Sequence, residues 1–198
     1  DPNSCNLRTA PKSAEDSFIS AGVNWLVSYE NVSHLSAPMQ DALCVMATGG
    51  GFAKRKLYSD ADESVISVKR PIILNGICAS VTAQDLMDRT ISIEMPTVAV
   101  RTETTSLWQI FDSEHGKLLG ALLDIMAAAL QKLPEVTITA EQRPRMIEFV
   151  RFGVAIALAL DATPAEFIES FRACRLDAVH RTIDANPVAA AVMTWLEE

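Results

Sequence analysis

The residues with the clearest potential for chemistry form a short run, in which Gly49-Gly-Gly51 precedes the basic residues Lys54, Arg55 and Lys56. Glycine-rich loops can wrap backbone N–H groups around phosphates, and a nearby lysine adds positive charge. The phosphate-binding pattern G-x-x-x-x-G-K-[S/T] would need a glycine before Lys54 and a hydroxyl residue after it, but the chain has Ala53 and Arg55 there. No other segment of the chain fits the pattern. The run therefore needs another interpretation.

A second set of candidates consists of polar residues that follow apolar runs. Glu30 follows the run Val23–Tyr29, and Asn75 follows Pro71–Leu74. Both runs are rich in strand formers, and ligands bind at the carboxyl ends of strands in open α/β sheets. We expect the two side chains to meet at a shared edge of adjacent parallel strands. The alternatives are a solvated strand end for Glu30 and an ordinary turn at Asn75.

Other elements of the first half are predicted from local signals. They are a helix that begins after Ser36 and ends at the three glycines, a β-hairpin with strands 55–58 and 65–68, a short helix capped by Thr82 and ending at Arg89, and a third strand at 90–95. Residues 1–20 are polar and contain two prolines, which predicts a loosely held N-terminal segment.

Beyond Pro96 the pattern is helical throughout. The periodic stretches are 103–132, 143–160, 164–180 and 187–197. The predicted fold class is therefore α/β, with a partial parallel sheet followed by an all-helical part, and the predicted boundary separates residues 1–97 from 98–198.

Composition limits the classes of function. The chain has 198 residues, 49% of them hydrophobic, which is typical of a folded protein with a sizeable core. Its net charge of −8 argues against nucleic-acid binding over the whole surface. The longest apolar run, Val154–Leu160, is too short to span a membrane. Four scattered cysteines and three histidines form no metal-binding pattern, so we expect buried thiols in a reducing compartment, the cytoplasm.

Several phrases in order resemble bacterial and phage-type ATP-binding proteins of the P-loop class, which are related in layout to AAA+ proteins, hexameric helicases and primase-helicases. The phrases are SYENVS at 28–33, LCVMATGGGFAKRKLYSDADE at 43–63, RPIILNGI at 70–77, DLMDR at 85–89 and RPRMIEF at 143–149. Separate phrases in the same order are more specific than a single motif.

The resemblance implies roles for individual residues. Glu30 matches the Walker B acid that holds Mg²⁺, although the family commonly has Asp there, and Asn31 follows it as in the family. Asn75 matches the sensor-one residue that orients water against the γ-phosphate. Arg89 resembles an arginine that reaches the phosphates of a neighbouring subunit, and Arg145 resembles a lid arginine that senses nucleotide. These roles suit phosphoryl transfer, which depends on positioning and charge stabilisation.

The implied function is that of part of an ATP-hydrolysing, helicase-like motor of phage or mobile-element type, with ATP and Mg²⁺ as ligands, a homo-oligomeric assembly and no membrane partner. Residues 1–97 would belong to the ATPase core and 98–198 to a helical lid. The glycine–basic run would form a mobile hairpin whose Lys54, Arg55 and Lys56 contact DNA. The alternative is a catalytically silent oligomerisation or nucleic-acid-binding module.

The resemblance also implies a missing part. The Walker A loop is expected before Asp1, and its strand would lie beside the strand at 71–75. We therefore expect strands 71–75 and 90–95 to pair with another chain or to close the gap in another way. The chain alone is expected not to bind ATP tightly.

Overall fold

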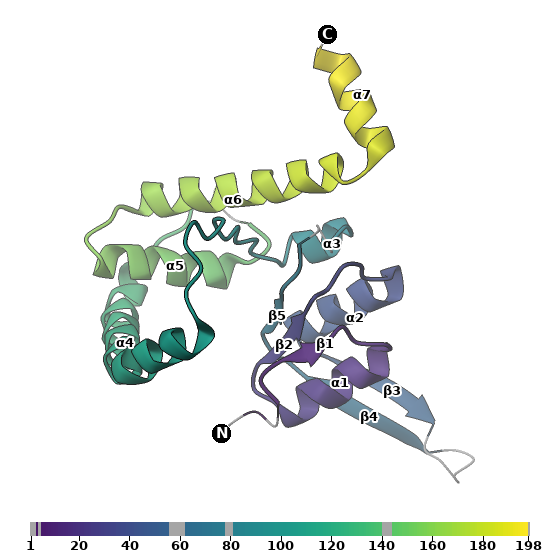
Figure 1. Ribbon diagram of the computed structural model, residues 1–198, viewed down its shortest axis with the longest axis horizontal. Helices are drawn as coiled ribbons and strands as arrows, with labels where there is room; N and C mark the ends of the chain where they lie inside the picture. The colour runs from purple at the N-terminus through teal and green to yellow at the C-terminus, as the bar shows by residue number, and fades with distance from the viewer. Residues whose placement is uncertain (1–2, 4, 56–61, 78–80, 140–143, 198) are drawn as a thin grey trace. The chain divides into compact units, whose positions relative to one another are not determined.

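A three-stranded parallel sheet lies at the centre of the first half of the chain. The computed structural model describes residues 3, 5–55, 62–77, 81–139 and 144–197. In it β1 (Arg8–Thr9), β2 (Val27–Glu30) and β5 (Ile72–Leu74) pair in the order β1-β2-β5 (Figure 1). Both pairings are parallel. The expected adjacency of the two apolar runs is therefore confirmed, although β2 begins at Val27 and not at Val23.

The segment before β2 contains a helix that the sequence patterns did not predict. α1 spans Ala14–Val23, where we expected a loosely held segment and the start of a strand. Its N-terminus is capped by Ser13, whose Oγ accepts a hydrogen bond from the N–H of Asp16 at 3.1 Å. Because Phe18 and Ala21 are fully buried on one face of this helix, packing against the core holds it in place.

The glycine run ends one element and begins the next. α2 (Ala37–Thr48) ends at Gly49, which has a φ of 92° and donates its N–H to the carbonyl of Val45 at 3.0 Å. This left-handed conformation strains any residue with a Cβ, so a glycine at this helix end is physically required. The predicted end of the helix is confirmed.

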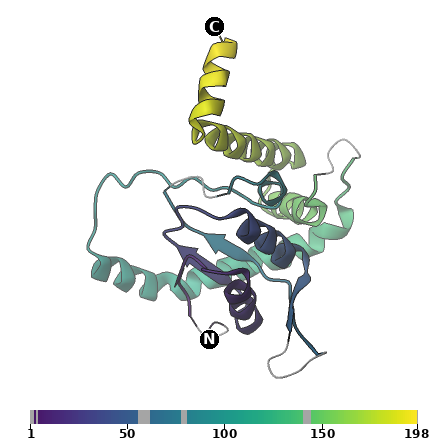
Figure 2. The ribbon, with the colours of Figure 1, turned by 90° about the vertical axis from the view of Figure 1, so that its right-hand side faces the viewer.

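An antiparallel hairpin is present as predicted, but its first strand lies at 50–55 and not at 55–58, and residues 56–58 lie outside the described part of the chain. β3 (Gly50–Arg55) pairs antiparallel with β4 (Glu63–Val68), and Gly50 and Gly51 lie opposite Val68 and Ser67. Both views show the hairpin beside α1, where the rings of Phe18 and Phe52 stack at 5.6 Å (Figures 1 and 2). Gly50 and Gly51 are thus paired in a ladder, which argues against the freedom of movement that we expected these glycines to give the hairpin.

The segment after β5 departs from the predictions at two points. The short helix is present as α3 (Gln84–Met87), but its N-cap residue is Ala83 and not Thr82, and no side chain caps it. Residues 90–95 form no strand. Strand propensity is realised only against a partner strand, and β5 has β2 as its only neighbour among the described residues.

The second half is helical, as predicted. It contains α4 (Thr104–Lys132), a 3₁₀ turn η1 (Leu133–Glu135), α5 (Ile147–Ala159), α6 (Pro164–Asp184) and α7 (Pro187–Glu197). None of the described helices is long and apolar enough to cross a bilayer.

The chain forms two compact units, and one of them is built from two separate segments of the sequence. The first unit comprises Asp1–Ile91 and Leu176–Glu198, and the second comprises Ser92–Arg175. The first break lies close to the expected boundary after residue 97, whereas the last segment groups with the first unit. Each unit has its own core: that of the first is built around Leu43, Met46 and Val27, and that of the second around Val150 and Val154.

A buried glutamine fixes the segment that leads into α3. Gln40 of α2 is 3% exposed. Its Oε1 accepts the N–H groups of Thr82 (2.8 Å) and Ala83 (2.7 Å), and its Nε2 donates to Thr82 Oγ1 (2.9 Å) and Leu35 O (3.0 Å). All four hydrogen-bonding positions of the amide are therefore used.

We expect Gln40→Ala to lower the free energy of unfolding by about 2 kcal/mol, because it leaves a buried backbone carbonyl at Leu35 and two part-buried N–H groups at Thr82 and Ala83 without these partners. Gln84→Ala is the matched control, since Gln84 is exposed on α3, and should change stability by less than about 0.5 kcal/mol. Urea unfolding measures both. Equal effects of the two variants would show that the amide network has no role in stability.

Candidate functional site

Glu30 and Asn75 lie next to each other on adjacent strands. Tyr29 pairs with Leu74 in the register of β2 and β5, and the ladder continues beyond the strands. Asn75 N–H donates to Tyr29 O at 2.9 Å, and Val32 N–H donates to Asn75 O at 2.9 Å. Glu30 is half-buried and Asn75 is exposed. Glu30 and Asn75 thus lie at the same edge of the sheet, by which we mean the edge formed by the carboxyl ends of β2 and β5.

The backbone turns sharply directly after Glu30. Asn31 has a φ of 54°, in the left-handed region, and its side chain is exposed. Asparagine tolerates this region better than most residues because its short amide can bond locally. The turn ends β2 after Glu30 and brings the fully buried Val32 beside Asn75.

Gly76 allows the backbone after β5 to approach the backbone of Val32 closely. A Cβ at this position would lie 2.2 Å from the carbonyl oxygen of Val32, which is closer than atoms can approach. The Asn-Gly pair at 75–76 therefore has a packing role at this edge that an ordinary surface turn would not require.

Arg89 is held within its own segment. Its Nη1 lies 2.6 Å from Asp85 Oδ2 and donates to Asp85 O at 2.7 Å, and its side chain is 13% exposed. The hydrogen bond with Asp85 raises the pKa of Arg89 above its ordinary value. Its Nε is buried without a hydrogen-bond partner among the described residues. A role toward a neighbouring subunit would require the guanidinium to leave Asp85.

Asp85 also faces a buried thiol that the sequence patterns did not assign to the site. Burial raises the pKa of Cys44 to about 11, and the nearby Asp85 carboxylate adds to the rise. The thiol therefore stays protonated at neutral pH and is a poor nucleophile. The expected burial of Cys44 is confirmed, and Cys78 lies outside the described residues.

The basic residues of the hairpin have acidic neighbours. Lys54 forms an ion pair with Glu15 of α1 and is 46% exposed. Arg55 lies opposite Glu63 in the hairpin register. Lys56 lies outside the described residues. An approaching phosphate would therefore have to compete with Glu15 for Lys54.

The structure brings together only part of the predicted set. Glu30, Asn31 and Asn75 share one edge, and Arg89 belongs to the same unit. Arg145 is exposed and belongs to the second unit. No group of three His, Cys, Asp or Glu side chains that could hold a metal occurs within the described part of the chain. Glu30 therefore belongs to no such group among the described residues.

Gly76→Ala should lower the free energy of unfolding by about 1–3 kcal/mol, because the added methyl group pushes the chain away from Val32. The exchange protection of the Val32 amide, which donates to Asn75, should fall with it. Gly116→Ala is the control: nothing lies within 4 Å of a Cβ there, so replacing this helical glycine should raise stability. Unchanged Val32 protection in Gly76→Ala would contradict this account of the edge.

Comparison with protein families gives one match. The sequence model of the family described as Actinomycete integrative conjugative element replication protein matches residues 1–181. Comparisons with curated proteins and with solved structures found no match.

Proposed function

We propose a function for this chain from the premise that it belongs to the family of actinomycete integrative conjugative element replication proteins. The description of this family names a role in the replication of a mobile element. The finer proposal is that the chain is part of an ATP-hydrolysing P-loop motor that acts on DNA. The observation that carries it is the pairing of β2 with β5, which brings Glu30 and Asn75 together where two parallel strands end.

This edge suits the hydrolysis of a phosphate anhydride. Glu30 can accept a hydrogen bond from an attacking water, and the amide of Asn75 can orient that water from the adjacent strand. Backbone hydrogen bonds that extend past the strands fix both positions, so the two backbones need no reorganisation before the reaction. Mg²⁺ commonly binds through one or two carboxylates together with substrate phosphates, so a single carboxylate at Glu30 fits it. The metal would neutralise charge on the phosphate oxygens.

The outer edge of β5 offers a place for the strand that the proposal still requires. In the described residues, β5 pairs on one side only, with β2. Ile73 within it is 50% exposed, and Ile77 just beyond it is fully exposed. Apolar side chains on an unpaired edge favour the addition of a strand. We propose that a strand carrying the phosphate-binding loop pairs here.

A catalytically silent nucleic-acid-binding module is the second candidate. The observation that favours it is the ion pairing of Arg89 with Asp85, which leaves the guanidinium 13% exposed and occupied within its own subunit. The two candidates differ in what happens when Glu30 and Arg89 are replaced.

ATP turnover tests the catalytic roles, in a protein extended upstream of Asp1 to include the phosphate-binding loop. Glu30→Gln should reduce kcat by about 10²–10⁴, because an amide cannot accept a proton from water. Arg89→Ala should also reduce kcat. Mixing the two inactive proteins should restore part of the activity, because some interfaces then combine an intact Glu30 with an intact Arg89 of the neighbouring subunit.

Glu169→Gln, at an exposed position of α6, is the control and should keep full turnover. Wild-type turnover in Glu30→Gln would exclude the catalytic role of this residue and favour the silent module. If both single variants are inactive and mixing restores nothing, Arg89 acts within its own subunit through Asp85.

DNA binding tests the hairpin. Replacing Lys54, Arg55 and Lys56 together by Ala should weaken binding to single-stranded DNA. The log–log slope of its salt dependence should flatten by about 0.7 for each phosphate that the variant does not neutralise. Glu15→Gln should have the opposite effect, because it releases the Lys54 ammonium from its ion pair. Fluorescence anisotropy over a salt series measures both.

Lys117→Ala is the matched control. This lysine is also paired with a carboxylate, that of Glu114 at 2.9 Å, but it lies on α4, outside the hairpin. Its replacement should leave DNA affinity unchanged. If the triple variant and Lys117→Ala lower affinity to the same extent, the hairpin makes no specific contribution.

A further inference from the structure

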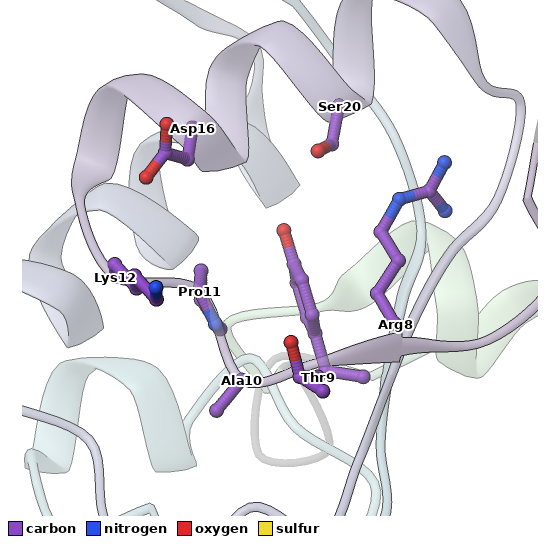
Figure 3. A pocket seen from close by; sticks show the side chains of 8 residues that line it. Arg8, Thr9, Ala10, Pro11, Lys12, Asp16 and Ser20 are labelled. Carbon is purple, nitrogen blue, oxygen red and sulfur yellow. The ribbon is translucent and has the colours of Figure 1, made fainter.

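A hollow in the first unit lies between the end of β1 and the facing side of α1. Its volume is about 250 Å³, and its lining consists of Arg8, Thr9, Ala10, Pro11, Lys12, Asp16, Ser20 and Tyr29. Figure 3 shows Asp16 and Ser20 on the helix, across the hollow from Thr9 and Ala10. The hollow is smaller than the roughly 300–1,000 Å³ of pockets for drug-sized ligands, so its ligand is small.

The hydroxyl of Tyr29 is the observation that points to a ligand. Tyr29 is 2% exposed, and its hydroxyl is buried with no hydrogen-bond partner among the described residues. Buried hydroxyls are rarely left without a partner, because they lose their bonds to water on folding. Since Tyr29 also lines the hollow, a group bound there could supply the missing bond.

The other polar groups of the lining define the chemistry of that ligand. Arg8 and Lys12 are cationic, and Thr9 and Ser20 add hydroxyl groups. Arginine, lysine and hydroxyl side chains are the common protein partners of phosphate oxygens. Asp16 is the one acidic residue of the lining, and a carboxylate favours a ligand that also carries a hydroxyl or amino donor. A bare anion would satisfy the cations but be repelled by Asp16.

We propose that this hollow binds the sugar–phosphate part of a nucleotide, with the phosphate toward Arg8 and Lys12 and with a sugar hydroxyl toward Asp16. The hydroxyl of Tyr29 bonds to the bound ligand. Successive side chains leave a strand on opposite faces, so Tyr29 and Glu30 serve different faces of β2. The hollow is therefore a second site, and it does not depend on the ATPase proposed for the edge at Glu30.

The ligand can come from two sources, a free nucleotide or the 3′-terminal nucleotide of a DNA strand, which is the nucleotide of a strand that keeps a free 3′-hydroxyl. Isothermal titration of the 198-residue chain with dTMP, with oligo(dT) and with inorganic phosphate separates them. We expect saturable binding of dTMP, with shifts in the amide resonances of residues 9–20 and of Tyr29. Binding of dTMP alone identifies a free nucleotide as the source, and comparable binding of oligo(dT) identifies the 3′ end of a DNA strand.

Two variants connect this binding to the hollow. Tyr29→Phe keeps the ring and removes only the hydroxyl, so dTMP affinity should fall at least about tenfold, while the thermal midpoint of the free protein stays the same or rises. Lys12→Gln should also weaken dTMP binding and reduce its salt dependence. Lys69→Gln, at an exposed position on the same unit, is the control for the loss of one positive charge and should leave affinity unchanged.

Three results would overturn the proposal: no saturable binding of dTMP or oligo(dT), equal affinity for inorganic phosphate and dTMP, or unaltered dTMP affinity in Tyr29→Phe. None of them bears on ATP turnover or on Glu30, so a failure here is distinct from a failure of the proposed motor function.

Discussion

The parallel pairing of β2 with β5 is the constraint on which the candidate site depends. The ladder continues past the regular strands through Asn75 N–H to Tyr29 O and Val32 N–H to Asn75 O. Gly76 permits this close approach, since a Cβ there would lie 2.2 Å from the carbonyl oxygen of Val32. The backbone therefore positions Glu30 and Asn75, whose side chains would supply the chemistry that we propose.

The hairpin between these two strands is also fixed at its base. Gly49 caps the C-terminus of α2, and the two glycines after it are paired in the β3–β4 ladder. The stacking of Phe52 on Phe18 joins the hairpin to α1, and the ion pair of Lys54 with Glu15 does the same. A DNA-binding role for Lys54 would thus be in competition with a contact that holds the hairpin against α1.

Local signals in the sequence predicted much of the fold. The apolar runs before Glu30 and Asn75 predicted adjacent strands, and the helical periodicity after Pro96 predicted the second half. The sequence patterns do not predict α1, although Ser13 and Asp16 have the spacing of an N-terminal cap, because Pro2, Pro11 and the polar residues around them favour an irregular segment. The strand expected at 90–95 does not form, because these residues have no partner strand to pair with among the described residues.

The interactions that shape the surroundings of the site could not be predicted in this way. Gln40 bonds to Thr82, 42 residues away, and Lys54 pairs with Glu15, 39 residues away. Such contacts depend on how the elements pack, and neither the periodicity nor the spacing of the residues involved indicates them. The unpaired hydroxyl of Tyr29 could not be predicted either. The position of Tyr29 in a strand predicts its burial, but not that its hydroxyl lacks a hydrogen-bond partner among the described residues.

The central claim is that Glu30 and Asn75 face the phosphate that is hydrolysed. The most direct measurement is an experimental structure of the upstream-extended protein with Mg²⁺ and a non-hydrolysable ATP analogue. The account predicts the γ-phosphate within reach of both side chains, directly or through one water at about 3 Å from each group, with an added strand paired to the outer edge of β5. A nucleotide bound elsewhere, with the edge at Glu30 and Asn75 left to solvent, would contradict it.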